Sequence, residues 1–434
     1  MGLVQSLSCS SPPRLSSRQW ALLLLLQAAG YFGQFDRTIF GMAVPQIQRD
    51  FGLSDAEMSY AASFVGLSAI LACATSCLSD RFGRARVLMW TLVPYTLATA
   101  FTALSKGVQS FALCQLAAQA FITAEGIISH VMVLEEMPAD CRGWAVGVLN
   151  IGSACGAGLA LLLFGLSGGA WRLMYALSIL PLCGVGILRR NLQETRRWAS
   201  LQEPKGVQLP VSAANEAASE AENEDTPLGI LPSKHRPGQV KQQHVAMVVA
   251  AFLGSFFPSA ANFHTSKHIQ TVHGFGASGF AKLSLVGGML SLSAFAIAGV
   301  VGDKYGRKRF GVLGIVLKTL VDVAFYSTAA GDSVAWVVAL FCLRTALSMA
   351  LDTTFQALSG EVFPTASRSS AQGLLVLAAG LGGPLGLLLS TQWAKSMGGP
   401  AAARLLAWGQ LGVAAIIGCF LPETKGRELE DING

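Results

Sequence analysis

Long apolar segments recur along the whole chain, and they constrain its fold more than any other feature. A helix needs about 20 mostly apolar residues to cross the hydrocarbon core of a bilayer. Only 13% of the 434 residues are charged, about half the share that is usual in soluble domains. The sequence therefore predicts an all-α membrane protein with twelve transmembrane helices. The expected spans are 19–43, 57–78, 87–104, 109–134, 144–166, 171–188, 244–266, 279–300, 310–330, 334–360, 369–392 and 403–421.

The spans fall into two sets of six, with a long polar stretch between them. This stretch is polar, lacks a long apolar run and contains an acidic segment at 215–225. Such a composition favours disorder, with room for a short surface helix. The predicted domains are an N-terminal tail (1–18), a first six-helix bundle (19–188), a linker (189–243), a second six-helix bundle (244–421) and a C-terminal tail (422–434).

The distribution of Lys and Arg predicts the orientation of the chain. With both termini in the cytoplasm, cytoplasmic segments hold 21 of the 31 Lys and Arg, whereas external loops and outer span ends hold six. Membrane proteins keep an excess of positive residues in their cytoplasmic loops. We therefore expect a multi-pass protein with both termini and the linker in the cytoplasm.

Several motifs occur twice, once in each half and in the same order. Asp80-Arg81-Phe82-Gly83-Arg84 recurs in the second half as Asp303-Lys304-Tyr305-Gly306-Arg307. Glu135-x-x-Pro138-x-x-x-Arg142 recurs at nearly the same offset as Glu361-x-x-Pro364-x-x-x-Arg368. Both halves begin on the same side, so they are parallel repeats, and such repeats place a substrate site at their interface near the middle of the membrane.

With these motifs the chain resembles the major facilitator superfamily over nearly its whole length. The stretch 299–309 is similar to that family's loop motif between the second and third helix of a half, while the first copy has Ser76 where the family usually has glycine. The stretch 422–430 resembles the tail of sugar-porter-type members, and 194–198 resembles their mid-chain motif. The resemblance implies two six-helix bundles around a solute pathway.

Acidic side chains recur where cytoplasmic helix ends disfavour them. Asp80 and Asp303 end one helix in each half, and Glu135 and Glu361 stand one turn before a helix-ending proline. The C-terminal end of a helix carries partial negative charge, so such acids need cations or another helix's N-terminus. The resemblance implies a cytoplasmic gate; the alternative is that the arginines merely face lipid headgroups. The expected gate residues are Asp80, Arg81, Arg84, Glu135, Arg142, Asp303, Arg307, Glu361 and Arg368.

Ionisable residues within the spans are functional candidates, because burying a charge in a membrane is costly. Asp36 and Arg37 are adjacent and point about 100° apart on a helix, so we expect one to face the cavity and the other a neighbouring helix. The stretches 36–38 and 43–47 are similar to the first helix of organic-anion members of the superfamily. This resemblance implies that Arg37 contacts a substrate carboxylate; the alternative is that Asp36 and Arg37 form structural pairs with other helices. Glu125 and Asp352 are candidates for proton coupling; the alternative is a fixed ion pair of either acid with Arg37 or Arg344. The expected solute and proton pathway comprises Asp36, Arg37, Glu125, Asn262, Arg344 and Asp352.

For Lys318, Asp322 and His130 the sequence predicts a structural role rather than a part in transport. Lys318 and Asp322 are one helical turn apart and are expected to pair locally on a peripheral helix. His130, one turn from the cytoplasmic end of its span, is expected to be structural.

The sequence favours secondary active transport of a small organic solute, in its more specific form an organic anion moving in symport with protons. The alternatives are a facilitative sugar-like carrier and a transporter-like sensor or scaffold that moves nothing. The expected partners are the solute, protons and the lipid bilayer, but no nucleic acid. No phosphate loop, nucleophile motif or paired metal ligands occur in the sequence, so no enzyme, cofactor or metal site is expected.

Overall fold

The computed structural model describes residues 15–202, 237–275, 277–427 and 429, and within these ranges the regular structure is helical. Most of the expected linker and nearly all of both expected tails lie outside these residues. The first half contains α2 (Ser17–Met42), α3 (Val44–Phe51), α4 (Asp55–Gly66), α5 (Ser68–Phe82), α6 (Arg84–Leu104), α7 (Val108–Glu136), α8 (Arg142–Leu166) and α9 (Trp171–Leu188), followed by η1 (Arg189–Asn191) and α10 (Arg196–Gln202).

The second half contains α12 (Pro237–Val272), α13 (Ala277–Tyr305), α14 (Arg307–Tyr326), α15 (Val334–Val362), η2 (Thr365–Ser367), α16 (Arg368–Met397) and α17 (Gly399–Phe420). The first crossing is broken at Ala43, between α2 and α3, and the second at Leu67, between α4 and α5. If α2 with α3 and α4 with α5 are each counted as one membrane crossing, the described residues of each half form six crossings. Eight of the described helical segments are long and apolar enough to span a membrane by themselves.

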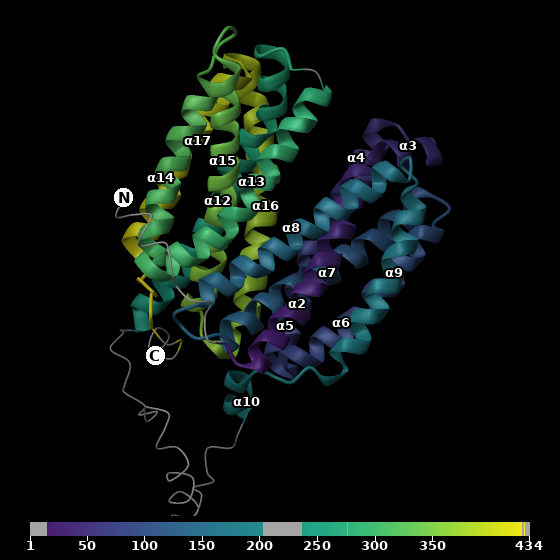
Figure 1. The fold of residues 1–434 in the computed structure, drawn as a ribbon, viewed down its shortest axis with the longest axis vertical. Helices are drawn as coiled ribbons and strands as arrows, with labels where there is room; N and C mark the ends of the chain where they lie inside the picture. Colours follow the sequence, from purple (N-terminus) through teal and green to yellow (C-terminus); the bar gives the residue numbers. More distant parts are fainter. Residues whose placement is uncertain (1–14, 203–236, 276, 428, 430–434) are drawn as a thin grey trace, which may run out of the picture.

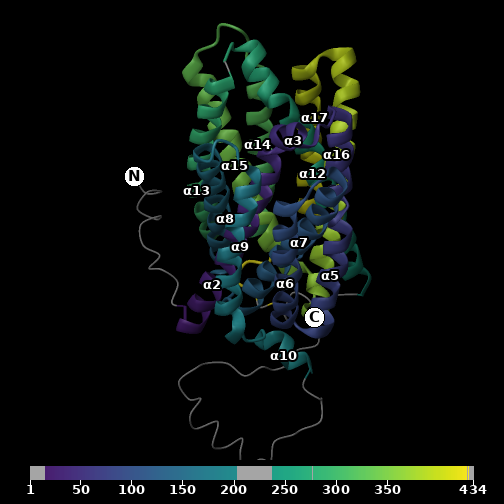
Figure 2. The same ribbon diagram turned by 90° about the vertical axis from the view of Figure 1, so that its right-hand side faces the viewer.

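The helices form two groups, α2–α9 and α12–α17, that meet at one end of the molecule and diverge toward the other (Figure 1). We call the end where they meet the α10 end, because α10 lies beneath it, and the opposite one the far end. Figure 2 shows the molecule from the side, with α10 at the same end. The groups contact each other mainly through α8 with α13 and through α5 with α16.

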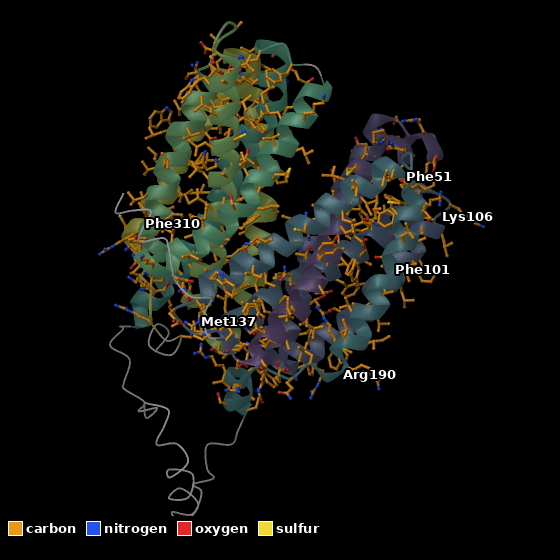
Figure 3. All side chains as sticks on the ribbon, in the orientation of Figure 1. Phe51, Phe101, Lys106, Met137, Arg190 and Phe310 are labelled. Carbon is orange, nitrogen blue, oxygen red and sulfur yellow. The ribbon has the colours of Figure 1, made fainter. Side chains whose placement is uncertain are left out.

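Each group has its own apolar interior, and its outer surface is apolar as well. Leu26, Ile128 and Val146 are buried in one group, and Met247, Leu358 and Ile417 in the other. Phe101, labelled in Figure 3, is 56% exposed. A surface with many exposed Leu, Ile and Phe residues suits lipid, so the folded chain is an integral, multi-pass membrane protein.

Glycines allow the two groups to approach closely. A Cβ atom on Gly299 of α13 would lie 2.4 Å from the carbonyl oxygen of Gly143 in α8. In the equivalent crossing, a Cβ on Gly373 of α16 would lie 2.2 Å from Oγ of Ser76 in α5. Ser76 is therefore accommodated in place of the family's glycine because the facing residue has no side chain.

The backbone conformation explains why each copy of the repeated loop motif contains a glycine. Gly83 and Gly306 have φ of 102° and 107°, a region that other residues rarely adopt. Each turn reverses the chain directly into α6 or α14. The repeated motif thus encodes the same tight helix-to-helix connection twice.

Candidate solute pathway and charge network

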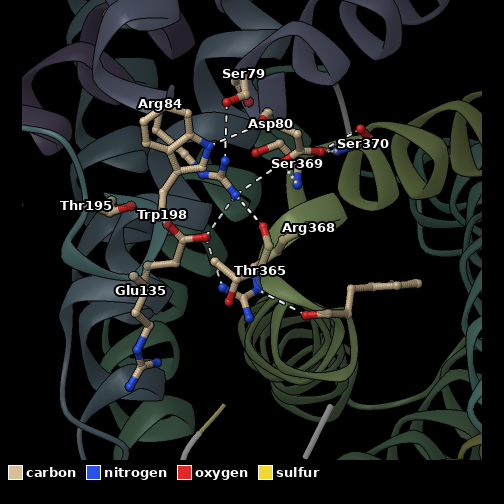
Figure 4. A network of polar contacts seen from close by, with 12 residues as sticks. Ser79, Asp80, Arg84, Glu135, Thr195, Trp198, Thr365, Arg368, Ser369 and Ser370 are labelled. Carbon is tan, nitrogen blue, oxygen red and sulfur yellow. Dashed lines mark hydrogen bonds and ion pairs between the residues drawn. The ribbon is translucent and has the colours of Figure 1, made fainter. Parts of the chain in front are cut away.

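At the α10 end, a buried cluster around Glu135 joins the two halves (Figure 4). The carboxylate of Glu135 on α7 lies 3.1 Å from the guanidinium of Arg84 on α6 and 3.0 Å from that of Arg368 on α16. Arg84 is also 3.1 Å from Asp80. Asp80 in turn accepts hydrogen bonds from the backbone amides at the start of α16, at 3.1 Å from Ser369 and 2.7 Å from Ser370. We call Asp80, Arg84, Glu135 and Arg368 the Glu135 network.

The second half contributes the equivalent cluster around Glu361. Arg307 of α14 forms ion pairs with Glu361 and, at 2.5 Å, with Asp303. Arg142 of α8 lies 3.5 Å from Glu361. Asp303 accepts hydrogen bonds from the amides of Gly143 at 3.1 Å and Trp144 at 2.9 Å, at the start of α8. We call Asp303, Arg307, Glu361 and Arg142 the Glu361 network.

In both networks an acid of one half holds an arginine of its own half and an arginine of the other. Each network contains two acids and two arginines, so it is neutral when all four groups are ionised. The aspartates use the positive N-terminal ends of α16 and α8, which favour nearby anions. The arrangement agrees with the electrostatic need anticipated for these acids, and it closes the α10 end with buried ion pairs that can separate only if the halves move.

Arg81, which was expected in this gate, lies outside both networks. Its side chain is exposed, and its guanidinium stands 5.5 Å from the centre of the Phe82 ring. Residues 81 and 84 point in different directions because they lie on either side of the turn at Gly83. The sequence could not separate the two arginines, since both belong to the same motif.

Two glutamates that the sequence analysis left without a role complete the networks. Glu194 accepts hydrogen bonds from the amides of Arg84 and Ala85, at 2.9 and 3.2 Å, at the start of α6. Glu423 accepts one from the amide of Arg307 at 2.8 Å, at the start of α14. Helix N-termini leave unpaired N–H groups that such carboxylates satisfy. The repetition of Glu-Thr at 194–195 and 423–424 was the signal that could have revealed them.

Cys141 lies beside the Glu361 network, in the loop before α8. Burial, reinforced by the carboxylates of Asp140 and Asp303, raises the pKa of its thiol from 9.0 to about 12. The thiol therefore stays protonated at neutral pH, and a thiol is a poor nucleophile compared with a thiolate.

Asp36 and Arg37 face different surroundings, as their adjacent positions on a helix predict. Asp36 is 1% exposed and accepts hydrogen bonds from the hydroxyls of Tyr95 at 2.6 Å and Thr99 at 3.2 Å, both on α6. Arg37 has an exposed side chain that donates to Oγ1 of Thr123 on α7 at 2.8 Å. Asp36 is thus held against a neighbouring helix, while Arg37 has an exposed side chain.

Glu125 is paired, but not with the arginines that the sequence suggested. Its carboxylate lies 2.7 Å from the guanidinium of Arg189, which follows α9 and is fully buried. The other carboxylate oxygen, Oε2, is buried without a hydrogen-bond partner among the described residues. The alternative of a fixed ion pair, which named Arg37 or Arg344 as the partner of Glu125, is thus wrong about the partner, because Arg189 at the end of α9 supplies the nearer cation.

A cavity of about 520 Å³ opens within the second half. Helices α12, α14, α15, α16 and α17 line it. Its polar wall is formed by Ser255, Ser259, Lys318, Asp352, Gln356, Gln372 and Gln410. Asp352 thus lines a space whose volume suits a small solute, and its place on the solute path stays a prediction.

Arg344 does not line this cavity. It is 5% exposed and donates from Nε to Asp322 at 2.9 Å and from one terminal nitrogen to Thr265 at 3.0 Å. Arg344 therefore holds α12, α14 and α15 together, and its expected place on the solute path stays a prediction. Asn262 lies in α12, but its side chain is outside the described residues.

The expected local pair of Lys318 and Asp322 is present, with Nζ 2.5 Å from Oδ2. Its helix is not merely peripheral, however, because Lys318 is among the residues that line the cavity. The sequence analysis missed this role because periodicity does not show which face of α14 meets the cavity.

Beyond the ion pairs, a polar contact between the halves joins α8 to α15. The side-chain amide of Asn150 donates to Thr353 at 3.1 Å and to Gln356 at 3.0 Å, and Gln356 lines the cavity. His130 has one ring nitrogen 2.7 Å from the carbonyl oxygen of Gly126 in its own helix, which fits the structural role expected for it.

These features define a membrane transporter built from two six-helix halves. The family model of the Major Facilitator Superfamily matches residues 28–387 and 294–429, and the chain belongs to this family. Its members are transporters rather than enzymes, and the fold class predicted from the sequence is confirmed.

Individual relatives share the architecture at low identity. The arabinose-proton symporter of Bacillus subtilis is 22% identical over 389 residues, covering 82% of this chain and 81% of that protein. The cis,cis-muconate transport protein of Acinetobacter baylyi is 20% identical over 373 residues, covering 83% and 84%. The structure of the proton:xylose symporter XylE bound to 6-bromo-6-deoxy-D-glucose matches with a TM-score of 0.74 and 18% identity, over 96% of this chain and 98% of that one. These comparisons agree with transport of a small solute.

Proposed function

We propose that this protein carries a small organic solute with an anionic group, in symport with protons, by alternating access. The observation that carries the proposal is the pair of neutral, buried networks that join the halves at the α10 end. Ion pairs that form in one state and part in another make a two-state element. In this proposal the two halves act as the rigid units of the transport cycle.

In this proposal the α10 end faces the cytoplasm, and so do both termini. The excess of Lys and Arg in the segments at this end supports the orientation. The structure then represents a state closed to the cytoplasm, and the gate opens when the Glu135 and Glu361 networks separate.

Arg37 is the proposed contact for the anionic group once the halves close around the solute. Its guanidinium donates to the neutral hydroxyl of Thr123, so its charge is not matched by an ion pair among the described residues. A guanidinium offers paired donors that match a carboxylate. The occurrence of a muconate transport protein among the relatives supports an anionic solute.

Glu125 is the proposed proton site. It is 5% exposed, and its free Oε2 oxygen gives a proton a place to bind. Protonation would release Arg189 from the ion pair and change how α9 is held against α7. The arabinose-proton symporter among the relatives supports coupling to protons.

Uptake by proteoliposomes tests the proposal, with cis,cis-muconate and arabinose as probes and an inward proton gradient as the driving force. We expect gradient-driven accumulation of the muconate dianion. Arg37→Ala should lower this uptake at least tenfold, whereas Arg86→Ala, at an exposed position on α6, should not change it. Glu125→Gln should abolish the response to the gradient but leave solute exchange intact, and Glu57→Gln, at an exposed helix start, is its control.

The other outcomes separate the alternatives. Uptake that equilibrates and ignores the gradient would identify a facilitative carrier. The absence of uptake of every probe would overturn transport and favour a transporter-like sensor. If Arg37→Ala took up the solute at the wild-type rate, the proposed contact between Arg37 and the anionic group would be wrong.

A further inference from the structure

Two opposite charges line the same cavity without pairing with each other. Lys318 lies on α14 and Asp352 on α15, and both belong to the wall of the cavity of about 520 Å³. No hydrogen bond or ion pair to Asp352 is formed within the part of the chain that the structure describes, although the charge of Lys318 acts on it electrostatically. Asp352 has an exposed side chain, so its carboxylate is accessible from the cavity.

The ammonium group of Lys318 is held in place, but its hydrogen-bonding capacity is not used up. Nζ lies 2.5 Å from Oδ2 of Asp322 and 3.2 Å from Oε1 of Gln410. An ammonium group has three donors, so one remains for a ligand. Gln410, which accepts from the ammonium group, also lines the cavity.

The charges around Lys318 do not cancel locally. Asp322 accepts from Lys318, from Nε of Arg344 at 2.9 Å and from the Gln410 amide at 3.1 Å. One carboxylate thus serves two cations, so the positive charge exceeds the negative by one among these four side chains. The carboxylate of Asp352 balances this excess across the cavity without neutralising it by contact.

A bound solute can complete both sites at once. Charges left without partners inside a membrane protein are costly, and a ligand that supplies the missing partners recovers that cost. A simple anion would pair with Lys318 but leave Asp352 without a partner. A simple cation would pair with Asp352 but leave Lys318 without an added partner. A molecule with both charges suits both groups.

We propose that this cavity binds a zwitterionic solute, whose carboxylate lies on Lys318 and whose ammonium group lies on Asp352. The proposal rests on the proposed transport function and specifies its substrate class. Phe355, Met349 and Leu375 provide an apolar surface for the body of the solute, and the cavity volume is in the range of ligand pockets, about 300–1,000 Å³. Arg37 does not line this cavity, so Lys318 is the cation beside the solute in this state.

Thermal stability of the purified, full-length protein tests the proposal with matched ligands, because a ligand that binds the folded state raises its unfolding temperature. One set is phenylalanine, 3-phenylpropionate and 2-phenylethylamine. The other is 4-aminobutyrate, butyrate and butylamine. We expect a larger shift with the zwitterion of at least one set than with its anion or cation at equal concentration. Equal or larger shifts with the singly charged analogues, or no shift with either zwitterion, would overturn the proposal.

Two reciprocal variants sharpen the test. Asp352→Asn should move the preference at least tenfold from the zwitterion toward the matched anion, and Lys318→Met should move it toward the matched cation. Lys318→Met leaves Asp322 paired with Arg344, so the fold retains a neutral pair. Asp332→Asn, in an exposed loop, is the control. Unchanged preferences in Asp352→Asn would overturn the proposal.

The experiments distinguish a failure of the zwitterion site from a failure of the transport proposal. If liposomes accumulate muconate while zwitterions neither stabilise the protein nor compete for uptake, the zwitterion site is lost and transport stands. If zwitterions bind with the expected preference but no probe crosses the membrane, binding stands and the transport proposal fails.

Discussion

Asp80 accepts a hydrogen bond at 2.7 Å from the backbone amide of Ser370, so the last turn of α5 in one half caps the first turn of α16 in the other. Asp303 makes the equivalent contact to α8 through the amide of Trp144 at 2.9 Å. The repeated loop motif therefore does more than turn the chain, because each copy binds the opposite half. This relationship makes the closed α10 end open to direct tests.

Neutralising one of these aspartates should open the α10 end. Asp303→Asn removes the charge that faces Arg307 and the start of α8, and breaking a buried ion pair costs about 3–5 kcal/mol. The distance between spin labels at Arg190 and Arg309, both exposed near this end, should shift to longer values. Asp332→Asn at the far end should leave the distribution unchanged. An unaltered distribution in Asp303→Asn would show that the cap does not hold the closed state.

Glu135 and Arg368 should be energetically coupled across the two halves. Glu135→Gln leaves Arg368 buried without its acid and Arg84 with Asp80 alone, whereas Arg368→Met leaves Glu135 paired with Arg84 at 3.1 Å. The double variant should be less destabilised than the sum of the single variants, by about 1–3 kcal/mol. Unfolding in detergent measures the three free-energy changes. Additive effects would mean that the contact contributes nothing of its own.

Cys141 should report on closure through its reactivity. With its pKa raised to about 12, the thiolate fraction at neutral pH is about a thousandfold below that of an ordinary cysteine. In a variant whose other cysteines are replaced, maleimide labelling of Cys141 should be slow, and Asp303→Asn should accelerate it. Fast labelling in the unmodified network would contradict both the burial and the raised pKa.

Gly373→Ala should weaken the contact between α5 and α16. The added Cβ would lie 2.2 Å from Oγ of Ser76, and Ser76→Gly should restore part of the loss by removing that atom. Gly380→Ala is a matched control in the same helix, because its Cβ would lie 3.5 Å from Ala69, an ordinary contact. Overpacking of this kind costs about 1–3 kcal/mol. The readouts are thermal stability and the spin-label distance, and equal behaviour of the two alanine variants would refute the steric argument.

The crossings could be predicted from the sequence because the requirement of a bilayer is local. A window of about 20 residues shows by itself whether it suits a hydrocarbon core. The repeat was visible for the same reason, since Asp80 and Asp303 stand in nearly identical strings. All the residues expected in the gate except Arg81 come together in the structure. They cluster around the acids that were expected to need partners because they lie at helix ends. Their role as a gate is a proposal.

The pathway was harder to predict because it depends on which faces of the helices meet. Arg344 and Lys318 are both cations within spans, yet Lys318 lines the cavity and Arg344 is held away from it by Asp322. The partner of Glu125 was also missed, because Arg189 lies far along the chain, beyond two further spans. A helical period identifies residues that share a face but not what that face contacts.

The sequence alone determined that the chain crosses a membrane many times, that its halves repeat, and which acids needed partners. These properties follow from local hydropathy, from repeated motifs and from the charge at helix ends, and each of these can be recognised in the linear sequence. Only the tertiary structure decided that Glu135 meets Arg368, a residue of the other half, and that Asp352 shares a cavity with Lys318 of the preceding helix. Packing of whole helices, rather than any local preference, brings these residues together.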